Sequence, residues 1–146
     1  DYHAENLIWL PNRNKNKRVG LLDYQDALAG HPAYDLASLL KDARRDVSFE
    51  LRDELIDYFL KKTKFDKRLF LRDYSILSAQ RNLKIIGIFA RLSIRDSKPG
   101  YLNLIPRVWK NLQDDLLHPS LTELSNFIKI SVPEPTVSTL QKINSV

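Results

Sequence analysis

The chain has 146 residues, of which 43% are hydrophobic, and its 23 Lys and Arg against 18 Asp and Glu give a formal net charge of +5. This length is typical of one domain with a substantial core, and the lack of cysteine excludes disulfides and thiolate metal sites and fits a reducing cytoplasm. No apolar run is long enough to cross a bilayer, because the best candidate, residues 85–92, is interrupted by Arg91.

The chain begins with a characteristic spacing of oxygen-bearing side chains. Asp1 and Asn6 form the pattern D-x-x-x-x-N, and Asp23 closes an apolar run further along. A carboxylate can orient a hydroxyl and accept its proton, whereas an amide oxygen and a second carboxylate are hard ligands that suit Mg²⁺. This order therefore matches the base and two metal ligands of a phosphate-transferring kinase. By itself the pattern is weak, since such residues also gather in turns.

The surrounding sequence strengthens this interpretation. A polar segment, residues 11–18, separates two short apolar runs, residues 7–10 and 19–24, which is typical of a β-hairpin. Asn6 would stand at the entrance of the hairpin and Asp23 at its exit, within reach of one ion. The basic residues of the polar segment have no aromatic residues between them, so a solvated loop is favoured over a nucleic-acid interface.

Beyond Asp35 the apolar spacing predicts helices. The first contains Leu36 to Ala43, and Ser48 suits the N-cap of the second. The further expectations are a long helix from about Lys67 to Arg95, another from Leu102 to Leu116, a short final one from Pro119 through Ile128, and a flexible tail over residues 131–146.

Three blocks in order carry a resemblance to a known family: DYHAENL at 1–7, LDYQDA at 22–27 and GHPAYDLA at 30–37. This stretch resembles the aminoglycoside phosphotransferase and choline kinase superfamily, which has a protein-kinase-like fold and phosphorylates small-molecule hydroxyls. The segments QRNLKIIGIFARL at 80–92 and PRVW at 106–109 are similar to bacterial kinases of cell-wall recycling. Those kinases phosphorylate the anomeric hydroxyl of N-acetylmuramate or N-acetylglucosamine.

The resemblance implies a fold that is mainly α with a short β-hairpin, the C-terminal lobe of a protein-kinase-like α+β fold. Residues 1–130 would form this lobe, with the catalytic loop and metal hairpin in 1–27 and a helical subdomain in 32–130. A chain that opens inside a catalytic loop and contains no methionine is expected to be a fragment. It would lack the N-terminal lobe, which carries the glycine-rich loop and its lysine, and would be inactive alone.

Carried over residue by residue, the resemblance makes Asp1 the catalytic base and makes Asn6 and Asp23 ligands of Mg²⁺, with ATP as the phosphate donor. Asp35 matches a buried aspartate that braces the catalytic loop; its place before Leu36 suits either such a brace or the charge at a helix N-terminus. The family also has a histidine two residues before the base, where this chain has no residue, and commonly an acid where His31 stands.

Four further residues are candidates for supporting or binding roles. Asp26 is either a turn residue or a partner of the metal ligands, and His3 either contacts phosphate or substrate or stabilises its loop. Arg81 and Asn82 either bind a sugar hydroxyl or N-acetyl group or belong to a helix face exposed to water. His31 is expected to serve the turn before Pro32.

The sequence therefore predicts a cytoplasmic small-molecule kinase fragment whose partners are a nucleotide, a small-molecule hydroxyl substrate and the missing lobe, with neither nucleic acid nor membrane. An amino sugar is the first expectation for the acceptor, and an aminoglycoside or another alcohol is the second. The alternative from a different class is a non-catalytic ligand-binding or interaction domain that retains the fold.

Overall fold

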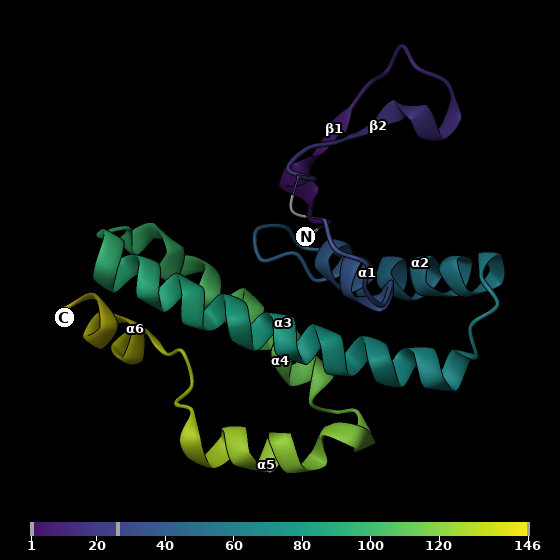
Figure 1. Cartoon of the computed structure of the whole chain (residues 1–146). Coiled ribbons are helices and arrows are strands. Elements are labelled where there is room, and N and C mark those ends of the chain that lie inside the picture. The colour runs from purple at the N-terminus through teal and green to yellow at the C-terminus, as the bar shows by residue number, and fades with distance from the viewer. Residues whose placement is uncertain (1, 26, 146) are drawn as a thin grey trace.

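A helix of 30 residues, α3 (Lys67–Asp96), runs through the middle of the computed structural model, which describes residues 2–25 and 27–145 (Figure 1). Asp66 caps this helix, because its Oδ1 accepts a hydrogen bond from the backbone N–H of Leu69 at 2.9 Å. At the other end Ser97 adopts a left-handed φ of 51° and Pro99 follows. The long predicted helix is confirmed, with boundaries set by these local signals.

The other elements surround α3, and the expected fold, mainly α with a short hairpin, is confirmed. The elements before α3 are η1 (Ala4–Asn6), β1 (Leu7–Trp9), η2 (Lys15–Arg18), β2 (Val19–Leu21), α1 (Ala33–Leu40) and α2 (Phe49–Lys62). The elements after it are η3 (Pro99–Leu104), α4 (Ile105–Asp115), η4 (Pro119–Leu121), α5 (Thr122–Ser131) and α6 (Val137–Asn144), where η denotes a 3-10 helix.

The two strands form an antiparallel hairpin that projects away from the helices (Figure 1). Leu7 pairs with Leu21, Ile8 with Gly20 and Trp9 with Val19. A Cβ atom at Gly20 would lie 2.6 Å from Cγ2 of Ile8, so glycine allows the two strands to approach at this pair.

Three apolar clusters make up the core of the described residues, and α3 contributes to each. The first joins the start of α3 to α1 and α2, the second joins its last turns to η3 and α4, and the third joins its middle to α4 and α5. Their buried members are, in order, Ala33, Ala37, Leu40, Ile56, Phe70 and Tyr74; then Ala43, Ile85, Phe89, Leu102, Ile105 and Val108; then Ala79, Leu112, Leu116, Leu121 and Ile128.

A buried ion pair crosses this core. Nζ of Lys41, directly after α1, lies 2.5 Å from Oδ1 of Asp115 at the end of α4. The other carboxylate oxygen of Asp115 accepts hydrogen bonds from Ser78 at 2.7 Å and Asn82 at 2.9 Å, both on α3. Burial raises the pKa of Asp115 above its ordinary value, and the ammonium of Lys41 opposes that shift. The network therefore ties α1, α3 and α4 together at one point.

Half of the segment expected to be a flexible tail, residues 131–146, is helical. Residues 137–144 form α6, in which Oγ1 of Thr136 caps the backbone N–H of Thr139 at 3.2 Å. Leu140 and Ile143, one turn apart, pack against the second cluster. The sequence signal is weak because this short helix buries only one narrow apolar stripe.

Among the described residues, no helix combines the length and the apolar character needed to cross a membrane.

Replacing Asp115 by Asn tests the buried ion pair. The change keeps the side-chain volume but leaves the ammonium of Lys41 without its counter-charge, so we expect the free energy of unfolding at neutral pH to fall by roughly 3–5 kcal/mol. Urea denaturation measures this loss. The matched control is Asp57→Asn, because Asp57 pairs with Lys67 at the surface, where solvent screens the two charges and the loss should be much smaller. Equal losses in the two variants would contradict the assignment.

Candidate functional site

The end of the hairpin brings the two predicted metal ligands to one place. The backbone N–H of Leu22 donates to the carbonyl oxygen of Asn6 at 2.8 Å, directly beyond the Leu7–Leu21 pair. Asn6 at the start of β1 and Asp23 after β2 therefore lie at the same end of the hairpin, as predicted. Asp23 is exposed, has a left-handed φ of 55°, and accepts a hydrogen bond from Gln25 at 2.7 Å. Binding of Mg²⁺ by this pair stays a prediction.

Two of the predicted site residues, Asp1 and Asp26, lie outside the described residues. The first turn that is described, η1, carries the chain from His3 into Asn6 through a backbone hydrogen bond of 3.0 Å between these two residues. Within residues 2–25 and 27–145 no group of three or more His, Cys, Asp or Glu forms a metal cluster. Mg²⁺ does not need such a cluster, since it keeps several water ligands and is commonly held by one or two protein oxygens together with phosphate.

The opening loop is braced by Asp42, a residue that the sequence analysis missed. The Asp42 side chain is 1% exposed, and its Oδ2 accepts a hydrogen bond from the backbone N–H of Ala4 at 3.0 Å. Its Oδ1 accepts from the backbone N–H of Arg44 at 2.7 Å, which is the usual bond of an Asx turn. One buried carboxylate thus joins the loop before the hairpin to the segment after α1.

Of the two roles considered for Asp35, the structure agrees with the charge at a helix N-terminus and not with the brace. Asp35 lies in the first turn of α1 with its side chain exposed, and no hydrogen bond to its carboxylate is found among the described residues. Its acid suits the positive end of the helix dipole. The sequence signal for Asp42 is weak: it lies two residues after the apolar end of a helix, where an Asp side chain often accepts a hydrogen bond from the backbone two residues on.

His3 is half-buried beside the brace. Burial lowers the pKa of His3 below its ordinary value of 6.5; the nearby Asp42 opposes this shift, and Arg44 and Arg81 add to it. Its Nδ1 atom is buried and makes no hydrogen bond within the part of the chain that the structure describes. The loop-stabilising hydrogen bond considered for His3 is therefore not found at this atom.

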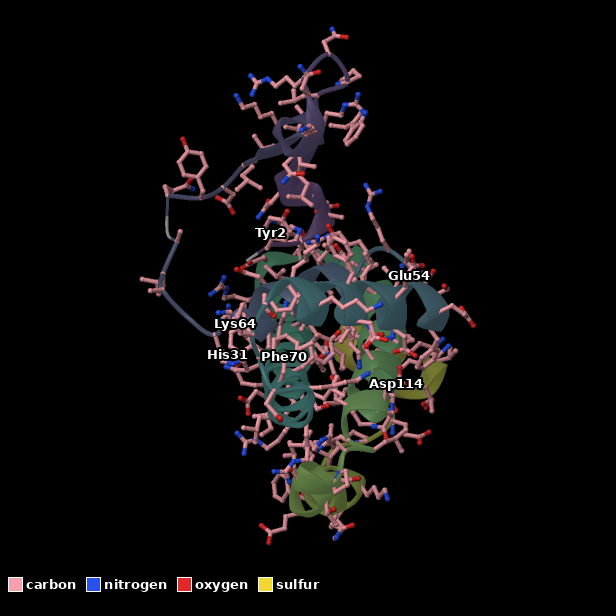
Figure 2. The ribbon with its side chains drawn as sticks, turned by 90° about the vertical axis from the view of Figure 1, so that its right-hand side faces the viewer. Tyr2, His31, Glu54, Lys64, Phe70 and Asp114 are labelled. Atoms are coloured by element: carbon pink, nitrogen blue, oxygen red, sulfur yellow. The ribbon has the colours of Figure 1, made fainter. Side chains whose placement is uncertain are left out.

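His31 serves the turn before α1, as predicted. Its Nδ1 accepts a hydrogen bond from the backbone N–H of Ala33 at 3.2 Å. Its ring lies 5.7 Å from the ring of Phe65 and 5.9 Å from that of Phe70, which Figure 2 shows beside it.

Arg81 and Asn82 do not form the water-exposed helix face considered for them. They are 3% and 1% exposed, respectively. The amide of Asn82 donates to Asp115 in the buried network, so Asn82 links α3 to α4. Burial lowers the pKa of Arg81, and the nearby Tyr34 and Asp42 oppose this shift.

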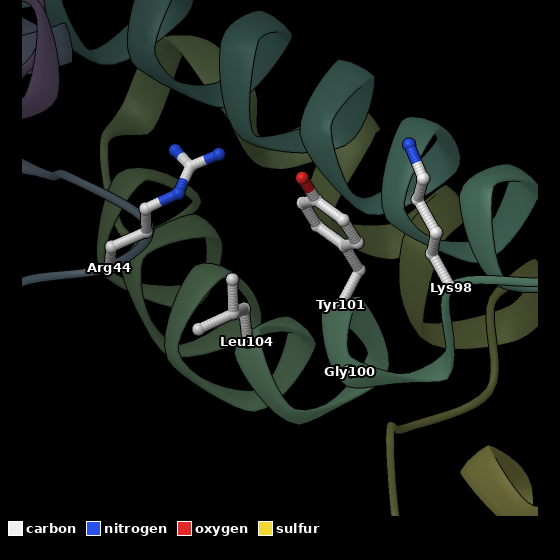
Figure 3. A pocket seen from close by; sticks show the side chains of 5 residues that line it. All are labelled: Arg44, Lys98, Gly100, Tyr101 and Leu104. Carbon is white, nitrogen blue, oxygen red and sulfur yellow. The ribbon is translucent and has the colours of Figure 1, made fainter.

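A pocket of about 280 Å³ adjoins the braced loop. Arg44, Lys98, Gly100, Tyr101 and Leu104 line it, from the segment after α1, the end of α3 and η3. Nε of Arg44 lies 3.1 Å from Oε2 of Glu5, a residue of the opening loop. Figure 3 shows Tyr101 between Arg44 and Lys98, with the polar ends of the three side chains on the same side.

Residues 1–77 match the family described as the Phosphotransferase enzyme family, APH. A protein from Caulobacter vibrioides named N-acetylmuramate/N-acetylglucosamine kinase is 48% identical over 137 residues, covering 93% of this chain and 38% of that protein. A protein of the same name from Pseudomonas aeruginosa is 39% identical over 144 residues, covering 92% of this chain and 40% of that protein. The chain thus spans about two fifths of the length of these relatives.

Replacing Asp42 by Ala should release the opening loop. Two backbone N–H groups lose their acceptor, so we expect the free energy of unfolding to fall by roughly 1–3 kcal/mol and amide exchange at Ala4 and Arg44 to accelerate. Denaturation and hydrogen exchange measure the two effects. Asp35→Ala serves as the matched control and should cost less than about 0.5 kcal/mol. If Asp35→Ala proved the more damaging change, Asp42 would not be the brace.

The environment of His3 predicts a pH dependence of stability. Because the pKa of folded His3 lies below the unfolded value of 6.5, the unfolded state binds a proton more readily, and stability is lost as the pH falls below about 6.5. Denaturation midpoints between pH 7.5 and 5 should therefore fall less steeply for His3→Gln than for the unmodified chain. Parallel curves for His3→Gln and the unmodified chain would refute the role of His3.

Proposed function

Because this chain belongs to the Phosphotransferase enzyme family, we propose that it is part of a kinase that transfers phosphate from ATP to a hydroxyl of an amino sugar. The acceptor proposed is N-acetylmuramate or N-acetylglucosamine, the two sugars in the names of the relatives. The observation that carries the proposal is the hairpin, whose paired strands hold Asn6 and Asp23 at one end, next to the loop that starts at Asp1.

Each residue of this end has a proposed part in the transfer. Asp1 accepts the proton of the attacking hydroxyl and orients it toward the phosphate. The amide oxygen of Asn6 and the carboxylate of Asp23 fit Mg²⁺, because both are hard oxygen donors and Asp23 is exposed to an incoming nucleotide. When bound, Mg²⁺ neutralises charge on the phosphate oxygens.

The supporting residues keep this geometry in place. Asp42 holds the backbone of Ala4, two residues before Asn6, so the amide ligand is fixed to the helices through a short and buried connection. Positioning of this kind matters because phosphoryl transfer needs little covalent help from the protein and depends on alignment and charge neutralisation.

We further propose that residues 1–130 form the C-terminal lobe of a two-lobe kinase of the cytoplasm, acting in the recycling of cell-wall sugars. The hairpin supports this, because it exposes large apolar side chains that suit packing against further protein (Figure 2). Their exposed fractions are 45% for Ile8, 62% for Trp9, 52% for Leu21, 51% for Leu22 and 71% for Tyr24. The missing lobe would supply the glycine-rich loop and the lysine that contact ATP.

The test is an assay of the protein extended to the length of its relatives. It should transfer phosphate from ATP to an amino sugar only when Mg²⁺ is present, and Asp1→Asn should lower kcat by roughly 10²-fold or more while the circular dichroism spectrum stays unchanged. Asp57→Asn, remote from the hairpin, should keep full activity. A screen of N-acetylmuramate, N-acetylglucosamine, aminoglycosides and choline identifies the acceptor. Turnover retained in Asp1→Asn would remove Asp1 from its role.

A further inference from the structure

We infer that the pocket between the end of α3 and η3 binds the acceptor sugar and that Lys98 recognises a carboxylate on it. N-acetylmuramate carries such a carboxylate, on the lactyl ether at its O3 atom, and N-acetylglucosamine lacks it. Lys98 would therefore set the preference between the two acceptors. This inference rests on the proposed function and goes one step beyond it, from the class of acceptor to the residue that distinguishes its members.

The pocket has the size and the lining that a monosaccharide requires. Its volume of about 280 Å³ is near the lower end of the roughly 300–1,000 Å³ of small-molecule sites. Tyr101 and Leu104 supply apolar surface, and the Tyr101 ring is held by the ring of Phe89 at 5.1 Å. A fixed aromatic ring gives the apolar face of a pyranose a rigid surface to pack on, at little cost in conformational entropy.

The pocket is joined to the proposed reaction centre through Arg44. The backbone N–H of Arg44 is held by Asp42, the residue that also holds Ala4, and its side chain is held by Glu5. Its guanidinium carbon also lies 5.9 Å from the centre of the Phe89 ring. A sugar in the pocket with its anomeric hydroxyl at the Arg44 end would therefore point that hydroxyl toward the loop between Asp1 and Asn6.

The charges of the pocket identify Lys98 as the group that meets the carboxylate. Arg44 already has the carboxylate of Glu5 as its partner at 3.1 Å. Lys98 is exposed, and its ammonium has no ion-pair partner in the described part of the chain. It lies on the far side of Tyr101 from Arg44 (Figure 3). An acceptor anchored at C1 by the Arg44 end would present its O3 substituent away from that end, where Lys98 stands.

A second pocket, of about 410 Å³, does not offer the same charge. Its lining contains the carboxylates of Asp114 and Glu134 beside the single cation Lys110. A negative substituent would be repelled there, whereas the first pocket has two cations and no acid in its lining. The charge of the lining therefore favours the first pocket for an anionic sugar.

The experiment compares two acceptors in the protein extended to the length of its relatives. Lys98→Gln should lower kcat/KM for N-acetylmuramate by roughly 10-fold or more, which is the range for losing a hydrogen bond to a charged group, and leave that for N-acetylglucosamine unchanged. The methyl ester of N-acetylmuramate, which has no charge, should be used equally well by Lys98→Gln and by the unmodified protein. Lys129→Gln, exposed on α5, is the control and should change none of these values.

Each result has a definite meaning. If Lys98→Gln lowers kcat/KM equally for both sugars, or for neither, Lys98 does not bind the carboxylate. The inference is then overturned, while the kinase assignment stands. If the unmodified protein phosphorylates neither sugar, the proposed function itself fails. Raising the salt concentration gives an independent check, because kcat/KM should fall for N-acetylmuramate and stay constant for N-acetylglucosamine if an exposed charge recognises the acceptor.

Discussion

The buried pair of Lys41 and Asp115 is the interaction on which the rest of the arrangement depends. Taking two charges out of water costs several kcal/mol for each ion, so the pair persists only because other groups satisfy it. Ser78 and Asn82 donate to Asp115, and the carbonyl oxygen of Asn111 accepts from Lys41 at 3.3 Å. An interaction of this kind adds less to net stability than to the specificity of the fold. Alternative packings of α1, α3 and α4 would leave a buried charge without its partner.

The same segment that carries this pair also fixes the proposed site. Lys41 points into the helices, Asp42 holds Ala4, and Arg44 reaches Glu5 beside the sugar pocket. Four consecutive residues after α1 thus connect the core, the opening loop and the pocket. The positions of the metal ligands and of the acceptor are linked through this short stretch of backbone, which is itself anchored where the core is most polar.

Local patterns in the sequence predicted the elements, and long-range contacts decided the details that the sequence analysis missed. The hairpin followed from two apolar runs around a polar segment, α2 from the cap Ser48 and α3 from its apolar spacing. Nothing near Asn82 in the sequence reveals that Asp115 lies opposite it. Likewise, Asp35 and Asp42 are both acids near a helix, and only the fold shows which of them meets Ala4.

The length of α3 has a consequence for how this chain loses its structure. At 1.5 Å per residue its 30 residues span about 45 Å, and α3 contributes residues to all three apolar clusters. None of the clusters can unfold without exposing apolar side chains of α3, so the helices are coupled into one cooperative unit. The hairpin contributes no residue to the three clusters and is tied to the helices through the contacts of Ala4 with Asp42 and of Glu5 with Arg44. Loss of the helical unit would therefore also release the proposed cation ligands.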